Sequence, residues 1–403
     1  MTRILSLDGG GTWALLQTRA LTALYPGERG HAILSHFDFA VANSGGSIVL
    51  GGLLHDMTPV EIEAYFTNSA ERAAIYVRTP RLLDTLLRLF GAGARYSTPA
   101  KGAKLRAVFG TAPLVSLDHS SGRTTHAVIV AFDYVRKRAF FFRSAPSPRF
   151  PTVTGVSIAD AVHASTTAPV LYFDRPAEVT VDLHYPGVGA APVVMQFWDG
   201  AVAGLNNPVA AAIAEAIAAG RPANDIAVLS LGSGAVIQSN NPAHRGDPDQ
   251  LAPAHIASGA IGDVKRLAAA VIDDPPDFAS FIAHTMLGGR GPVGDETVPT
   301  RIVRLNPLIL GDFMGGEWRR PAWNDRAAAP DLFRRLQTLG IDAVAQSEVA
   351  DIERLATAWL TDAAWNQPVR ANFFQSPSLG LHAEIGHTRF SAAAAAARDL
   401  GLV

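Results

Sequence analysis

The 403-residue chain contains no cysteine, which excludes disulfide bonds, thiol nucleophiles and thiolate metal sites. It also lacks any uninterrupted apolar run of about 18 residues, the length that a membrane-spanning helix needs. The net charge of −2 gives no reason to expect nucleic acid as a partner through bulk electrostatics. No signal peptide precedes the first apolar stretch, so we expect a cytoplasmic location, with specialised secretion left open.

What is present is a composition of 48% hydrophobic and 17% charged residues, typical of a well-buried globular protein. Apolar strand-like runs alternate with helix-like segments, which predicts an α/β fold around a mainly parallel sheet. Residues 170–173 are expected to form a strand, and 300–305 the last strand. No long linker interrupts the chain. We therefore expect one domain over residues 1–403, with a core up to about residue 310 and a helical extension over about 311–403.

One stretch has the layout of a nucleophile elbow, the sharp strand-to-helix turn that presents a catalytic serine. An apolar run over 37–43 ends at Ser44, and a small-residue, helix-forming segment follows over 48–54. The usual spacing is Gly-x-Ser-x-Gly, because only residues with little or no side chain fit around the serine. Here it reads Ala42-Asn43-Ser44-Gly45-Gly46. Alone this is weak evidence, since serines beside glycines are common in loops.

A glycine-rich turn follows the first predicted strand, which covers residues 4–7. The turn reads Asp8-Gly9-Gly10-Gly11 and leads into a predicted helix over 12–24. Such a turn places free backbone N–H groups at a helix N-terminus, which suits a phosphate or the oxyanion of an acyl-transfer intermediate. We expect Asp8 to cap this turn.

Three later stretches complete a pattern. They are Ala164-Ser165-Thr166-Thr167-Ala168-Pro169 followed by Tyr172-Phe173, Asp199-Gly200-Ala201 followed by Asn206-Asn207-Pro208, and Leu229-Ser230-Leu231-Gly232-Ser233-Gly234. With the glycine turn and the elbow, and in this order, they resemble the patatin-like phospholipase family over roughly residues 4–234. Arg304-Leu305-Asn306-Pro307 extends the resemblance more weakly. The resemblance implies a three-layer α/β/α fold with additional C-terminal helices.

The resemblance also implies an activity, that of a lipid acyl hydrolase of the phospholipase A, lysophospholipase or carboxylesterase type. The family uses a serine and an aspartate without histidine. Carried over by motif, Ser44 is the nucleophile and Asp199 the base that takes its proton. The implied oxyanion hole consists of backbone N–H groups, those of Gly9, Gly10, Gly11 and Gly45.

The implied substrate is a phospholipid or another fatty-acyl ester, with transient contact to a membrane surface and no nucleic acid. The resemblance implies no cofactor and no metal, and the oligomeric state stays open. The helical segment 70–105 and the Pro/Gly-broken segment 238–297 are candidates for a lid over the site. His126, His163 and His184 are treated as structural because no motif places them near Ser44.

The chain departs from the family pattern at two places. Trp13 and Ala14 stand where the family has a basic residue and a glycine, and Ala42 stands for the first glycine of the elbow. Because of the first departure, the conformation of the glycine turn stays open. The family's basic residue, and any contact it would make with an anionic headgroup, is missing here. The second adds one methyl group, for which we expect a small adjustment of packing.

Two alternatives remain at this point. One alternative is a catalytically silent patatin-like module that binds lipid or a partner. Asp199 precedes a glycine and, taken alone, is an ordinary turn residue. The other is a sugar kinase of the actin-like fold, because Asp8 to Thr12 also looks like a first phosphate loop and Leu231 to Gly234 could imitate a second. The kinase alternative leaves Ser44 and the Asp199 motif unexplained.

Overall fold

The computed structural model describes the chain except for residues 80–93, 146–151, 186–187, 238–250, 252–258, 260–275, 290–299, 315–316, 325–328 and 371–384. Its centre is a mixed sheet with the strand order β11-β9-β1-β2-β4-β8-β7-β6, to which β3 and β5 add at β4. The strands of this sheet, in chain order, are β1 (Thr2–Leu7), β2 (Phe39–Asn43), β3 (Leu117–Asp118), β4 (Thr124–Asp133), β5 (Arg138–Arg143), β6 (Thr152–Thr154), β7 (Ala177–Tyr185), β8 (Val188–Asp199), β9 (Ile226–Leu231) and β11 (Ile302–Leu305).

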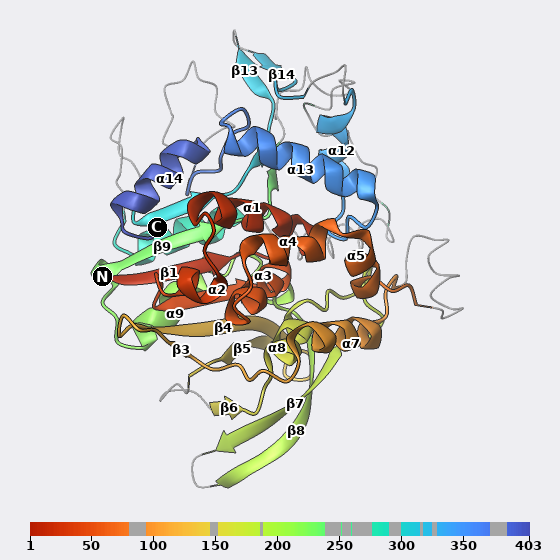
Figure 1. Cartoon of the computed structure of the whole chain (residues 1–403), viewed down its shortest axis with the longest axis vertical. Helices are drawn as coiled ribbons and strands as arrows, with labels where there is room; N and C mark the ends of the chain where they lie inside the picture. The colour runs from red at the N-terminus through yellow and green to blue at the C-terminus, as the bar shows by residue number, and fades with distance from the viewer. Residues whose placement is uncertain are drawn as a thin grey trace.

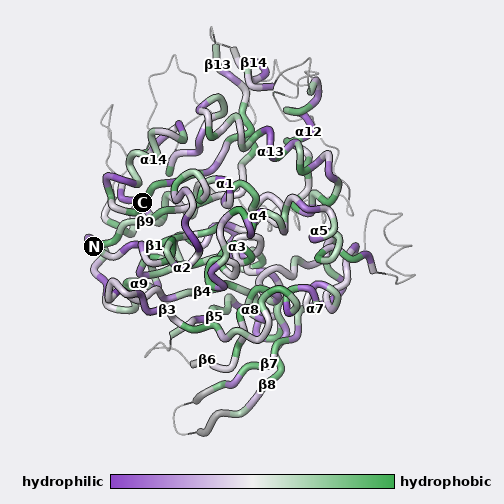
Figure 2. Tube along the Cα trace, in the orientation of Figure 1, coloured by the Kyte–Doolittle hydropathy of each residue, from purple (hydrophilic) through white to green (hydrophobic). Residues whose placement is uncertain are grey.

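Helices cover this sheet. They are α1 (Leu15–Leu24), α2 (Gly30–Leu34), α3 (Ser44–Leu54), α4 (Pro59–Thr67), α5 (Ser69–Ile75), α7 (Thr98–Phe109), α8 (Ile158–Ser165), α9 (Val209–Ala218), α11 (Pro276–Met286), α12 (Leu332–Thr338), α13 (Gln346–Leu360) and α14 (Phe390–Asp399), with short 3-10 turns η1 (Gly11–Ala14), η2 (Gly200–Ala203) and η3 (Ala223–Asp225). Hydrophobic residues follow the central strands and the helices packed on them, α8 among them (Figure 2).

The parallel strands β11, β9, β1, β2 and β4 are buried on both faces. Every residue of β2 and of β9 is buried, as expected for strands between two helical layers. Because successive side chains point to opposite faces, Leu5 and Ala40 join a core with α1, α3, α8 and α13, whereas Ile4 and Val41 join a second core with α9 and α11. The predicted α/β/α architecture with a parallel centre is therefore confirmed.

The strands beyond β4 run antiparallel, and the hairpin of β7 and β8 extends at one end of the molecule's long axis (Figure 1). Asp199 is the last residue of β8 and pairs with Ala131 of β4. The C-terminal ends of β1 and β2 lie side by side, with Leu7 opposite Ala42. This register brings the glycine turn after β1 and the elbow after β2 to one edge of the sheet.

Two expectations about strands are wrong. Residues 170–172 form a turn, and Phe173 makes only an isolated bridge with Tyr96. The N–H of Leu171 donates to Pro169 O and that of Phe173 to Ala168 O, which uses donors that a sheet would need. Strand β11 is not the last one. It is followed by β12 (Leu308–Ile309), which pairs with β10 (Ala235–Val236), and by the hairpin of β13 (Asp312–Met314) and β14 (Glu317–Arg319).

The part after residue 310 therefore begins with a hairpin, and helices α12, α13 and α14 follow it, as the sequence predicts. Their apolar side chains, such as Leu336, Ile352 and Ala393, belong to the same core as Leu5 of β1. The boundary between a core and an extension near residue 310 stays a prediction.

A buried ion pair joins the first and last strands of the parallel centre. Arg304 of β11 donates to Asp8, just after β1, with Nη1 3.0 Å from Oδ1 and Nη2 bonded to Oδ2. Arg304 Nη1 also lies 2.8 Å from Ser230 Oγ of the intervening strand β9. Both charged side chains are almost inaccessible to solvent. Asp8 thus pairs with a distant strand, and its carboxylate does not cap the glycine turn as expected.

Arg304→Met leaves the Asp8 carboxylate buried without its charged partner. We expect the free energy of unfolding to fall by about 3–5 kcal/mol, the usual cost of breaking a buried pair on one side. Urea denaturation followed by circular dichroism measures it. Arg29→Met, which removes an exposed pair with Asp56, is the control and is expected to cost about 1 kcal/mol or less. Equal losses of unfolding free energy in the two variants would contradict a buried ion pair between Asp8 and Arg304.

Candidate active site

The chain turns sharply at Ser44, between β2 and α3. Ser44 has φ +47°, a left-handed backbone conformation that costs a non-glycine residue roughly 1–3 kcal/mol and is concentrated at functional sites. Gly46 makes the turn sterically feasible, because a Cβ there would lie 2.5 Å from Asp8 O and 2.7 Å from Leu7 O. The N–H of Ser44 donates to Ser165 Oγ at 2.8 Å. The structure therefore has the elbow that the sequence predicts.

Ala42, the departure at the start of the elbow, is fully buried in the core that faces α3. Its methyl group packs within that core, so the elbow tolerates it. The substitution changes packing beneath the serine and leaves the turn itself in place.

Asp199 lies against the elbow. Its Oδ1 accepts hydrogen bonds from Asn43 Nδ2 at 3.1 Å and from the N–H of Ala201 at 2.9 Å. Oδ2 has no partner of ordinary hydrogen-bond geometry within the described part of the chain, and the Ser44 hydroxyl is close enough to lower the carboxyl's pKa. The structure thus brings the two predicted dyad residues together, with one carboxylate oxygen left for the serine.

The electrostatics of Asp199 are dominated by burial, since its side chain is wholly excluded from solvent. Burial raises the pKa of the carboxyl, and the hydrogen bonds from Ala201 and Asn43, the nearby Ser44 hydroxyl and the charge of Lys101 only partly oppose it. The net pKa is above the ordinary 3.8. A carboxylate with a raised pKa accepts a proton more readily, which suits a general base.

The glycine turn and the elbow touch each other. A Cβ on Gly45 would lie 2.5 Å from Gly11 O and 2.8 Å from Gly11 N, so the two backbones approach as only glycines allow. Among the described residues, no backbone acceptor outside their own helical turns binds the N–H groups of Gly10, Gly11 and Gly45. Gly9 differs, because its N–H donates to Asn206 O at 2.8 Å. Of the four predicted oxyanion donors, Gly9 is therefore already engaged and is not free for a substrate.

The free space above Ser44 is small. It amounts to about 20 Å³, enough for about one water molecule, and Gly11, Gly45, Tyr76 and Ile341 are among the residues that enclose it. An acyl chain therefore needs some of these residues to move.

Residues 340–342, here called the strap, cover this space from the C-terminal part of the chain. The N–H of Thr12 donates to Ile341 O at 2.8 Å, and Trp13 Nε1 donates to Gly340 O at 3.2 Å. Trp13, the first departure from the family pattern, therefore helps to hold the strap over the glycine turn.

A second set of bonds anchors the strap on its other side. Asp342 Oδ2 accepts from Tyr96 Oη at 2.6 Å and from Arg95 Nη1 at 2.9 Å. Both donors lie in the expected lid segment 70–105, which also supplies Tyr76 to the cavity wall. The other expected lid, 238–297, lies largely outside the described residues.

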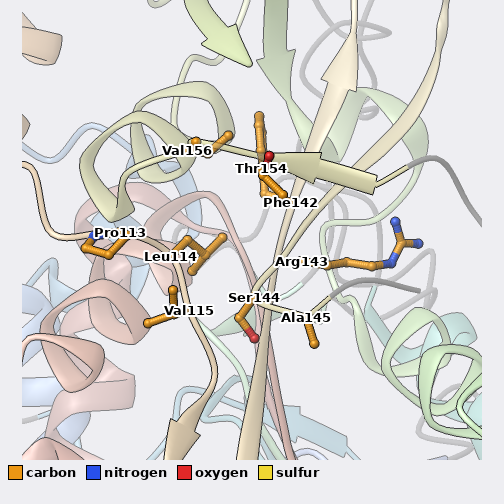
Figure 3. Close-up of a pocket in the computed structure, with 10 residues that line it drawn as sticks. Pro113, Leu114, Val115, Phe142, Arg143, Ser144, Ala145, Thr154 and Val156 are labelled. Atoms are coloured by element: carbon orange, nitrogen blue, oxygen red, sulfur yellow. The ribbon is translucent and has the colours of Figure 1, made fainter. Parts of the chain in front are cut away.

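A larger cavity of about 140 Å³ lies elsewhere, around β5 (Figure 3). Its lining is mostly apolar and includes Pro113, Leu114, Val115 and Phe142, and it shares no residue with the space above Ser44. This cavity is not part of the candidate site.

Sequence reasoning missed several residues that shape the site. Asn43 and Ser165 lie inside motifs that it did recognise, and the amide of Asn43 next to the serine was a visible sign of a partner for a carboxylate. Lys101 and Ile341 lie outside every motif, and nothing in their local sequence marks them. His163 is buried, burial lowers its pKa well below the ordinary value, and its carbonyl accepts from Lys101. Its structural role stays a prediction.

The described residues include no cluster of three side chains suited to a metal ion. Within the same residues, no helix has the length and apolar character needed to span a membrane.

A serine on a strained elbow, next to a buried carboxylate and unengaged glycine N–H groups, is the arrangement typical of a serine–aspartate hydrolase.

Comparison with known proteins gives the family. The model of the patatin-like phospholipase family matches residues 5–213, more than half of the chain, and the chain belongs to this family. Among solved structures it is similar to VipD from Legionella pneumophila, with a TM-score of 0.31 and 9% identity over 89% of this chain and 67% of that chain. No curated protein matches it significantly. Family membership leaves the sugar-kinase alternative without support.

Asp199→Asn removes the buried charge and retains an oxygen that accepts from Asn43 and Ala201. The pKa of Asp199 is higher in the folded than in the unfolded protein, so ionising its carboxyl lowers the free energy of unfolding. This loss is complete above the folded-state pKa and disappears as the pH falls through that pKa to the unfolded-state value. We expect the variant to be more stable than the wild type by about 1 kcal/mol at neutral pH. The gain should shrink as the pH falls through the raised pKa. Urea denaturation at neutral and acidic pH tests this, and lower stability of the variant at both would contradict it.

Proposed function

We propose that this protein is a lipid acyl hydrolase that cleaves fatty-acyl esters through an acyl-enzyme on Ser44, with Asp199 as the base. The observation that carries the proposal is the pairing of the two side chains. Ser44 is held in a strained elbow, and the carboxylate beside it is buried, has a raised pKa and keeps one oxygen without another partner. Membership of the patatin-like family supports the same chemistry.

In the first step, Ser44 Oγ attacks the ester carbonyl carbon while its proton passes to Asp199. The carbonyl oxygen becomes an oxyanion, for which the N–H groups of Gly10, Gly11 and Gly45 are the available donors. Each such donor typically contributes on the order of 10²–10³ in rate. When the tetrahedral intermediate collapses, the alcohol leaves with the proton held by Asp199, and the acyl group stays on Ser44.

In the second step, water attacks the acyl-enzyme and gives its proton to Asp199. The same N–H groups receive the second oxyanion. Collapse returns the proton to Ser44 Oγ and releases the fatty acid. Because Asp199 must be ionised to accept a proton in both steps, activity should fall as the pH drops through its raised pKa.

Ser44→Ala removes the nucleophile and Asp199→Asn the base, so we expect either change to lower the hydrolysis of p-nitrophenyl butyrate by about 10³-fold or more. Ser35→Ala, which alters a partly exposed serine away from the site, should leave the rate unchanged. Initial rates with purified protein measure the effect. Full activity in Ser44→Ala or Asp199→Asn would rule out the dyad.

Labelling distinguishes the hydrolase from a silent lipid-binding module. A fluorophosphonate probe reacts only with an activated serine, and mass spectrometry of the labelled peptide should identify Ser44. A wild-type protein that binds lipid vesicles but neither labels nor turns over esters would support the silent module instead.

The strap generates a prediction about substrate size. Ile341→Ala opens the small space above Ser44, so the ratio of kcat/KM for an octanoyl ester to that for an acetyl ester should rise about tenfold. Leu339→Ala, one residue before the strap, does not line this space and is the control. An equal change of the ratio in both variants would show that loosening the segment, not the cavity wall, controls access.

A further inference from the structure

Lys101 of α7 is a buried lysine in the wall of the Ser44 cavity. Lysine is rarely buried because removing its charge from water is costly. Its ammonium lies 2.7 Å from Thr167 Oγ1, 2.8 Å from Thr166 Oγ1 and 3.1 Å from His163 O. It also lies 4.3 Å from the centre of the Phe173 ring, on the face that attracts cations.

The hydrogen-bond partners around Lys101 suit a protonated amine. Thr166 Oγ1 donates its own hydrogen to Val162 O at 2.8 Å, and Thr167 Oγ1 donates to His163 O at 2.6 Å. Both hydroxyl oxygens can therefore only accept from Nζ, and the carbonyl of His163 is an acceptor in any case. Three acceptors need three N–H groups, which only the ammonium form supplies. Burial lowers the pKa of Lys101 well below its ordinary value, and the negative charge of Asp199 opposes this shift.

The groups bound to Lys101 belong to residues 163–167, here called the 163–167 segment, and this segment holds both dyad residues. Ser165 Oγ accepts the N–H of Ser44 at 2.8 Å, and Thr167 O accepts the N–H of Asp199 at 2.8 Å. Gly102 allows the close approach of α7, since a Cβ there would lie 2.9 Å from His163 Nε2. Lys101 is thus linked to Asp199 through Thr167, and to Ser44 through Thr166, the chain neighbour of Ser165.

Lys101 also acts on Asp199 through its charge. Among the described residues, the groups that face Asp199 are Asn43 and Ser44 from the elbow, the N–H of Ala201, Lys101 from α7 and Tyr76 after α5. Tyr76 is neutral because burial raises its pKa, and His163, which faces Lys101, is neutral because burial lowers its pKa. Lys101 is therefore the cation that opposes the cost of ionising Asp199.

We propose that Lys101 is a positioning residue for the proposed hydrolysis, because its ammonium fastens the 163–167 segment beneath Ser44 and Asp199 and its charge stabilises the ionised base. The inference rests on the proposed function and adds a third residue to the dyad. In this role Lys101 acts through Asp199 and the 163–167 segment.

Lys101→Met has a similar length and no charge. We expect kcat for p-nitrophenyl butyrate to fall on the order of 10²-fold, as a small misplacement of catalytic groups does, with KM changed by less than about threefold. The acidic limb of the pH–kcat/KM profile should move to higher pH, because Asp199 loses the cation that favours its ionised form. A merely structural role would lower kcat without moving this limb.

Lys104→Met is the matched control, since Lys104 lies one turn further along α7 and pairs with Glu71. It should leave kcat and the acidic limb unchanged. Lys101→Gln, a smaller neutral replacement, is the second variant. Near-ultraviolet circular dichroism shows whether Lys101→Met and Lys101→Gln are folded. If the wild type is active and a folded Lys101 variant keeps the acidic limb of the pH–kcat/KM profile at the same pH, this inference is wrong. The proposed function is unaffected by that result. A wild-type protein without ester turnover and without Ser44 labelling overturns the proposed function, and this inference with it.

Discussion

The constraint on which the site depends is the burial of the Asp199 carboxylate. An ion that is excluded from water needs compensating hydrogen bonds and charge, or it becomes protonated. Asn43 and the N–H of Ala201 bind one oxygen, and Lys101 supplies a positive charge from α7. This partial compensation leaves a carboxylate whose proton affinity is raised, and its contacts connect the elbow, η2 and α7.

The parallel centre of the sheet supplies the other half of the site. In α/β sheets, functional groups gather beyond the carboxyl ends of parallel strands. Here β1 ends at the glycine turn and β2 at Ser44, and their backbones meet where Gly11 touches Gly45. Asp199 arrives at the same edge from β8, which runs antiparallel to β4, so the dyad joins the parallel and antiparallel parts of one sheet.

The features that were predictable from sequence depend on short segments. The elbow and the glycine turn carry their geometry in adjacent residues, because only glycine tolerates the close contacts at Gly46 and Gly45. The remaining features depend on long-range contacts without a local pattern. Lys101 meets Thr167 across 66 residues, and Thr12 meets Asp342 across 330. The hydrogen bond from the N–H of Gly9 to Asn206 O could not be predicted for the same reason, although both residues lie in recognised motifs.

The ion pair of Asp8 with Arg304 has a consequence for the order in which the site is completed during translation. Ser44 and Asp199 leave the ribosome long before Arg304. Until β9 and β11 have emerged, β1 is an edge strand and Asp8 has no cationic partner. A nascent chain can therefore carry Ser44 and Asp199 and still have an unfinished glycine turn. The surroundings of Asp8 are therefore completed only after most of the polypeptide has been made.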